Sequence, residues 1–257
     1  MKKRATLLLL NLSALCLPQH LHAAALMLDF GPTAVAESSR TNSPYHTADP
    51  AFTQTTWNQV QTADVSVGGL LWSDGTPAMD IALNIGGNSG AGITIIDLSK
   101  TGLSCEALGG SNTSGIYAGT SVGTDAIFLG TSGTRAVGLQ ITGLAAGTYD
   151  IYIVARNTNT TSPQTQSLYV GTAAAGSGNF DFSGYDKKML TYAGNMTATS
   201  AWSEDANYVR FSVSLSAGEV LNLACSAPAR GFLNSVQIVP AIPEPSTYAF
   251  VAAPDGP

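Results

Sequence analysis

The chain has 257 residues and a formal net charge of −6, with 44% hydrophobic and only 11% charged residues. This apolar share excludes a disordered chain, and the length allows one large β-domain or two small ones. Outside the first four positions the densest basic group is the pair Lys187–Lys188. A nucleic-acid surface needs several clustered cations, so no nucleic-acid partner is expected.

The first 25 residues have the three parts of a secretory signal peptide. Positions 2–4 are Lys-Lys-Arg, an apolar stretch follows over 5–17, and the segment ends in small residues at Ala23 and Ala25. We expect cleavage after Ala25 and export of the chain. The apolar stretch is too short for a membrane-spanning helix, which takes ~20 residues. Removal of this segment leaves 8 basic and 17 acidic residues, a net charge of −9.

Short alternating segments and turn residues then follow from residue 26 to about residue 240. The polar segment 33–55 is expected to be a long loop. The clearest hairpin has period-two patterning on both sides of the turn at 143–147. The principal expected strands lie at 26–30, 70–72, 79–84, 93–98, 137–141, 149–154, 166–170, 209–215, 220–225 and 232–239.

These patterns predict an all-β protein. We expect an antiparallel β-sandwich over residues 26–240, jelly-roll-like and with roughly ten to thirteen strands. No segment shows a helical period of ten residues or more. A division into two sandwiches near Gly130 stays open, although nothing there resembles a linker.

Cys105 and Cys225 are the cysteines that remain after the signal segment. In an oxidising compartment they are a candidate disulfide. Such a bridge would close a loop of about 120 residues and contribute roughly 4–5 kcal/mol in the chain-entropy account. Two separately buried thiols are the alternative.

The C-terminal segment 241–257 contains Pro243, Glu244 and Pro245, followed by Ser246 and Thr247. This run resembles the PEP-CTERM sorting signal. The resemblance implies export by a Gram-negative bacterium, often one that makes extracellular polysaccharide, and processing by an exosortase-type membrane peptidase. The family pattern continues into an apolar helix and an Arg-rich tail, but here the apolar run stops at 254–257, Pro-Asp-Gly-Pro. If this tail does not direct sorting, the expected location is the periplasm rather than the outer surface.

The body of the chain is also similar to sandwich domains that are common in such proteins. The resemblance spans most of residues 26–240 and implies a fold and a location, but no activity. Its recurring features are Asp29-Phe30-Gly31, Trp57-Asn58, Ser73-Asp74-Gly75, Gly147-Thr148-Tyr149 and the segment 231–235.

Carbohydrate is the ligand class that the residue types favour. Sugar sites combine an aromatic platform with amides and carboxylates, because a pyranose has an apolar face and a polar edge. Trp202 is expected to be the most exposed aromatic, since 200–207 has the composition of a loop. Core packing is the alternative and is favoured for Trp72. The candidate ligand-binding residues are Trp57, Asn58, Asp74, Tyr152, Trp202 and Asn207.

Catalysis is not expected. The run 119–123, Gly-Thr-Ser-Val-Gly, matches a nucleophile elbow, but its acid and histidine should follow the serine, whereas His46 precedes Ser121. One histidine and two distant cysteines do not predict structural zinc. We assign no metal ligand and no cofactor, and leave calcium open because acids in β-loops bind it readily.

The sequence thus predicts an exported, non-catalytic β-sandwich of the cell surface or the exopolysaccharide and biofilm matrix, with polysaccharide as a candidate partner. A purely structural surface protein and a carbohydrate-active enzyme are the two alternatives.

Overall fold

The computed structural model describes residues 23–61, 66–108, 115–130, 133–160, 162–176, 178–192 and 199–241. Most of the expected signal peptide and the Pro243–Thr247 motif lie outside these residues. In the described part, no helix is long and apolar enough to cross a membrane.

The all-β prediction is confirmed, with sixteen strands in the described ranges. The count exceeds the prediction because several strands have only two or three residues. The elements are β1 (Leu26–Phe30), η1 (Glu37–Ser39), α1 (Pro44–Ala48), β2 (Asn58–Val60), β3 (Ser66–Val67), β4 (Ala82–Ser89), β5 (Ile95–Asp97), β6 (Leu103–Glu106), β7 (Ala126–Leu129), β8 (Arg135–Thr142), β9 (Gly147–Val154), β10 (Gln164–Ala174), β11 (Asn179–Asp181), β12 (Asp186–Tyr192), β13 (Val209–Leu215), β14 (Glu219–Ala227), β15 (Phe232–Leu233) and β16 (Ser235–Pro240).

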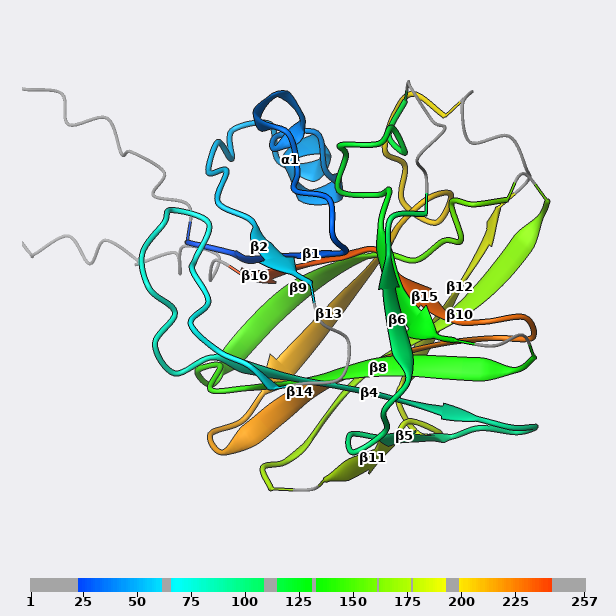
Figure 1. Cartoon of the computed structure of the whole chain (residues 1–257). Coiled ribbons are helices and arrows are strands. Elements are labelled where there is room, and N and C mark those ends of the chain that lie inside the picture. The colour runs from blue at the N-terminus through cyan, green and yellow to red at the C-terminus, as the bar shows by residue number, and fades with distance from the viewer. Residues whose placement is uncertain are drawn as a thin grey trace, which may run out of the picture.

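Two sheets form the sandwich (Figure 1). The smaller sheet has the order β13-β9-β16-β1-β2, and the larger has the order β11-β5-β4-β8-β14-β10-β12 with β3 beside β4. A short third sheet has the order β15-β7-β6. Pairing is antiparallel except between β1 and β2. The chain crosses between the two main sheets from β8 to β9, from β12 to β13 and from β13 to β14, as it does in jelly rolls.

The chain forms one sandwich rather than two. The first strand, β1, pairs with the last, β16, in the smaller sheet. In the larger sheet β4 pairs with β8 along its whole length. Strands from both sides of Gly130 therefore share each sheet, and neither half can close its core alone.

The main core between the sheets is largely aliphatic. Period-two alternation places every second residue of β1, β8 and β9 on the inner face, so Leu28, Leu139 and Ile151 are fully buried there. The opposite, outer face of the smaller sheet has a second buried cluster, which we call the outer aromatic layer. Its aromatic members are Tyr45, Phe52, Tyr117, Tyr152, Trp202 and Tyr208, with Trp57 half-buried against it.

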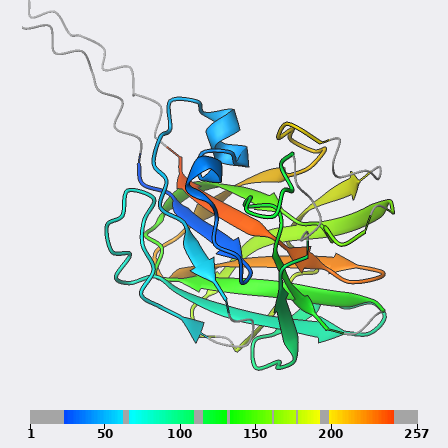
Figure 2. The same ribbon diagram turned by 45° about the horizontal axis from the view of Figure 1, so that its top comes forward.

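The segment 33–55 was predicted to be a loop, but it contains η1 and α1 (Figure 2). Pro44 suits the first turn of α1, because a proline there gives up no helical hydrogen bond. The helix is fixed to the sheet by Gln237 of β16, whose Oε1 accepts the N–H of Tyr45 at 3.0 Å. The sequence did not predict this helix, because the hydrogen bond that holds it joins Tyr45 to Gln237, 192 residues further along the chain.

His46 ties α1 to the segment that follows it. Its Nε2–H donates to the carbonyl of Gln54 at 3.0 Å, and its Nδ1 accepts from the hydroxyl of Ser43 at 2.7 Å. The residue is buried, and burial lowers the pKa of its imidazole. A neutral ring is therefore part of the folded structure.

The two cysteines do not form the candidate disulfide. Cys225 in β14 is fully buried and its thiol donates to Gln166 Oε1 at 3.1 Å. Cys105 in β6 is half-buried and its thiol donates to the carbonyl of Val60 at 3.4 Å. Burial raises the pKa of Cys105 to about 11 and that of Cys225 to about 12, so both are unreactive thiols at neutral pH.

Ala25, the expected last residue of the signal peptide, is fully buried. Its N–H donates to Ser73 Oγ, and its carbonyl accepts the N–H of Ser73, both at 2.8 Å. Cleavage after Ala25 would remove these two hydrogen bonds.

Candidate functional site

Two of the aromatic residues predicted to bind a ligand, Trp202 and Tyr152, are buried in the outer aromatic layer and do not lie at the surface. Trp202 is only 5% exposed and packs edge-on against Tyr117, with 6.0 Å between ring centroids. The prediction that Trp202 is the most exposed aromatic is wrong. Tyr152 is buried between Tyr45 and Tyr208.

The loop that carries Trp202 folds back over the sheet because Asn207 closes it. Asn207 Oδ1 accepts the N–H of Ser203, and its Nδ2 donates to the carbonyl of Ala201. Asn207 is itself buried. The loop prediction for 200–207 thus agrees with the structure, but its tryptophan points inward.

Asn58 and Asp74 have local structural partners. Asn58 Nδ2 donates to the carbonyls of Met27 and Leu71, and its Oδ1 accepts the N–H of Leu71. Asp74 is exposed and accepts from the N–H and hydroxyl of Thr76, and these hydrogen bonds lower the pKa of Asp74. Both therefore hold loops in place, as aspartates and asparagines in turns commonly do.

Trp57 is the predicted candidate that lines a hollow. This hollow, the Trp57 hollow, has a volume of about 190 Å³ and lies between β2 and the segment that follows β1. The indole is half-buried, and its Nε1–H donates to the carbonyl of Arg40 at 3.0 Å. The lining residues are Asp29, Ala34, Val35, Arg40, Thr56, Trp57 and Gln59.

The polar groups of the Trp57 hollow differ in exposure and charge. Arg40 is exposed, Gln59 is half-buried and Asp29 is buried. Gln59 Nε2 donates to the carbonyl of Gly31 at 3.1 Å, which fixes its side chain beside the hollow. The site therefore combines an aromatic ring, an amide, a cation and a carboxyl group.

Sequence reasoning missed Asp29, Arg40 and Gln59 as members of this site. Asp29 had a usable signal, because it is an acid inside an otherwise apolar strand, Leu-Met-Leu-Asp-Phe. Gln59 directly follows the Trp57-Asn58 pair. No sequence signal pointed to Arg40, since it lies in an irregular polar segment.

A second, larger hollow of about 1000 Å³ lies where the described chain begins and ends. Met79, at its surface, is 85% exposed. Tyr149 directs its hydroxyl to the carbonyl of Ala145 at 2.8 Å rather than into the hollow. Most of the lining of this larger hollow is apolar. The principal side chains that line it are Trp72, Pro77, Met79, Asp80, Thr148, Tyr149 and Pro240.

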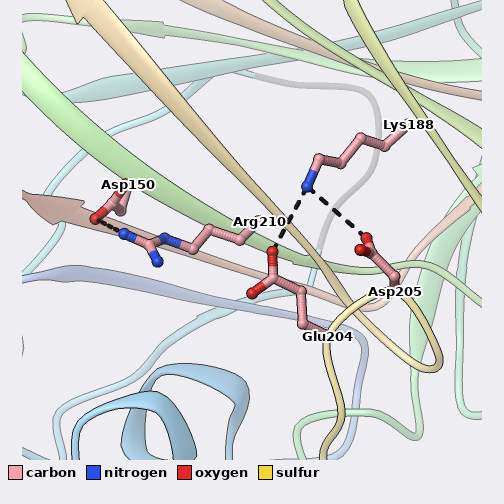
Figure 3. Close-up of polar contacts among 5 residues, drawn as sticks. All are labelled: Asp150, Lys188, Glu204, Asp205 and Arg210. Carbon is pink, nitrogen blue, oxygen red and sulfur yellow. Dashed lines mark hydrogen bonds and ion pairs between the residues drawn. The ribbon is translucent and has the colours of Figure 1, made fainter.

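Two groups of charged side chains form ion pairs on the strands and in the loop near Glu204 (Figure 3). Arg210 Nη2 lies 2.7 Å from Asp150 Oδ2, and Arg210 also lies over the ring of Tyr152. Lys188 Nζ lies 3.5 Å from Glu204 and 3.7 Å from Asp205. These partly exposed ion pairs each contribute only about 0–1 kcal/mol to stability, so they add little to the stability of this region.

The serine of the elbow-like run has structural partners. Ser121 Oγ donates to the carbonyl of Ile116 at 2.6 Å and lies 3.0 Å from Thr124 Oγ1. His46 is held by Ser43 and Gln54, in a different segment. The geometry therefore does not join Ser121 to a histidine base.

Comparisons with solved structures give matches of low similarity. No family model and no curated protein matches the chain. TmCBM61 in complex with beta-1,4-galactotriose has a TM-score of 0.29 at 11% identity, over 62% of this chain and 88% of that one. A family 35 carbohydrate binding module from Clostridium thermocellum has a TM-score of 0.30 at 12% identity, over 46% of this chain and 80% of that one.

A Bacillus thuringiensis Cry1Da tryptic core variant scores equally, with a TM-score of 0.29 and 11% identity, over 55% of this chain and 21% of that one. At these scores no residue of this chain can be equated with a residue of those proteins. The sandwich assignment therefore rests on the sheets themselves.

Proposed function

We propose that this chain is an exported, non-catalytic β-sandwich protein that binds polysaccharide at the Trp57 hollow. The proposal rests on one observation: the half-buried indole of Trp57 lines the same cavity as Arg40, Gln59 and Asp29. A sugar ring offers an apolar face to the indole and hydroxyls to the polar groups. The volume of about 190 Å³ is below the ~300–1,000 Å³ of pockets for drug-sized ligands. The site would therefore hold one sugar unit, such as a chain end or side branch.

The location in this proposal rests on the sequence. The signal-peptide pattern of residues 1–25 supports export, and the Pro243–Thr247 motif supports a place at the cell surface or in an exopolysaccharide or biofilm matrix. An exosortase-type peptidase is the proposed processing partner. The proposed absence of catalysis is supported by the structural hydrogen bonds of Ser121 and His46.

Binding of the purified protein to a panel of polysaccharides tests the ligand. The panel pairs neutral glucans with uronate-containing polymers, because Arg40 at the rim can pair with a carboxylate. Trp57→Ala should weaken binding at least about tenfold, equivalent to roughly 1.4 kcal/mol. Trp72→Ala is the matched control, since it removes a half-buried tryptophan from the larger hollow.

Unchanged affinity in Trp57→Ala would move the site away from this hollow. A wild-type protein that binds no member of the panel would favour a purely structural surface protein. Release of reducing ends from any polymer would favour the carbohydrate-active enzyme.

A further inference from the structure

Two buried carboxyl groups lie near the C-terminal end of β1 in the smaller sheet. Asp29 lies in β1, and Asp125 immediately precedes β7. Each residue is only 2% exposed. The Oδ1 atom of each has no hydrogen-bond partner in the described ranges. Buried polar atoms are nearly always paired, so two orphan oxygens in one place require an explanation.

The bend after β1 is shaped to receive Asp125. Gly31 has a φ of +150°, and a Cβ there would fall 1.9 Å from the Cβ of Asp125. Only glycine therefore leaves room for this carboxyl group. The N–H of Thr33 then donates to Asp125 Oδ2 at 2.7 Å. One oxygen of Asp125 is thus fixed by the backbone, and the other is left free.

The two carboxyl groups interact through their charges. Burial, and then the charge of Asp125, raise the pKa of Asp29, and burial raises the pKa of Asp125. Among the described residues, neither carboxylate has a Lys or Arg within ion-pair distance. After burial, the charges of Asp125 and Asp29 are the next causes of the raised pKa of the Cys105 thiol. Arg40 lines the same hollow as Asp29 but forms no ion pair with it, so within the described part of the chain neither acid is neutralised by a directly paired cation.

We propose that Asp29 and Asp125 together bind a calcium ion. Calcium takes six to eight oxygen ligands from carboxylates, backbone carbonyls and water. No group of three or more His, Cys, Asp or Glu residues with metal-binding geometry is found in the described part. The donors that Asp29 and Asp125 offer are carboxylate oxygens, which suit calcium better than zinc because zinc prefers nitrogen and sulfur. The Trp57 hollow reaches Asp29 and gives the ion and its waters an entry path.

The calcium site shares Asp29 with the Trp57 hollow, whereas Asp125 does not line that hollow. The proposed role of the calcium site is to hold two segments together, which differs from contact with a sugar. Asp29 belongs to the first strand, whereas Asp125 belongs to the segment that leads into β7. A calcium ion bound by both residues would join β1 of the smaller sheet to the segment that precedes β7. Extracellular calcium modules bind in the range of about 10⁻⁴–10⁻³ M, which suits an exported protein.

The test is calorimetric calcium titration and thermal unfolding of the purified full chain after treatment with a chelator. The wild-type protein should bind one calcium ion and unfold at a higher temperature in millimolar calcium than in equal magnesium. Asp29→Asn and Asp125→Asn should each weaken calcium binding at least tenfold and abolish the shift. In chelator, both variants should unfold at or above the wild-type temperature, because each removes one of two repelling buried acids.

Asp74→Asn is the matched control, because it changes an exposed acid and should keep the full calcium response. Trp57→Ala should also keep it, even if sugar binding is lost, so failure of one proposal is distinguishable from failure of the other. The calcium site is overturned if calorimetry of the wild-type protein shows no heat of calcium binding and its unfolding temperature rises no more in calcium than in magnesium. It is equally overturned if either Asn variant folds and retains the wild-type calcium response.

Discussion

The two faces of the smaller sheet are built from different chemistry. Its inner face, represented by Leu28 and Ile151, packs aliphatic side chains against the larger sheet. Its outer face packs Tyr152 against other rings and also holds Asp29 and Gln237. The inner face needs only volume and apolarity, because dispersion and burial have no direction. The outer face needs particular donors and acceptors, because a buried polar group without its partner is costly.

The largest expected effect is on the inner face. Leu28→Ala should lower the free energy of unfolding by about 2–5 kcal/mol, because it opens a cavity between the sheets. Urea unfolding measures the loss. Leu28→Met is the matched control, and it should cost less than about 1.5 kcal/mol since volume and apolarity are kept. Equal losses in the two variants would show that the inner face also depends on exact shape.

A smaller effect is expected where shape is kept and one acceptor is removed. Gln237→Met leaves the side-chain volume nearly unchanged but leaves the buried N–H of Tyr45 without its partner. The expected loss is about 1–3 kcal/mol, and we expect it to exceed the loss of Leu28→Met in the same urea experiment. A loss no larger than that of Leu28→Met would mean that the two faces follow the same rule.

The smallest expected effect is a pH dependence of the free energy of unfolding, which arises from His46 beside the outer aromatic layer. Burial lowers the pKa of His46 from its usual value near 6.5, so the unfolded chain takes up the proton first. This contribution is fully present above about pH 6.5 and is lost as the pH falls toward and below the folded pKa, by less than about 1.4 kcal/mol per pH unit.

Thermal unfolding of the wild-type protein and His46→Gln between pH 7.5 and 5 measures this dependence. The difference between the two proteins is the relevant quantity, because the raised pKa values of Asp29 and Asp125 act in the opposite direction. A constant difference across this range would contradict a buried neutral imidazole.

Much of the fold was predictable because a strand has a strict period of two. The strands expected on the two sides of the turn at 143–147 match β8 and β9, and the expected strand at 209–215 coincides with β13. The hairpin expected from the first two is wrong, because β8 pairs with β4 and β14 in the larger sheet, whereas β9 pairs with β13 and β16 in the smaller one. The candidate site was less predictable. Of the six residues proposed from their chemistry, Trp57 lines a hollow, whereas Tyr152, Trp202 and Asn207 are buried in or near the outer aromatic layer.

The sequence by itself determined the all-β class and the positions of most strands, because these depend on local pattern and composition. The export and sorting signals stay predictions from the same kind of local pattern. Only the tertiary structure decided which strand faces are covered and which distant side chains meet. Period two separates the two faces of a strand, but it does not say what lies over each face. The burial of Trp202, the separation of Cys105 from Cys225 and the close approach of Asp125 to Gly31 all depend on segments far apart in the chain.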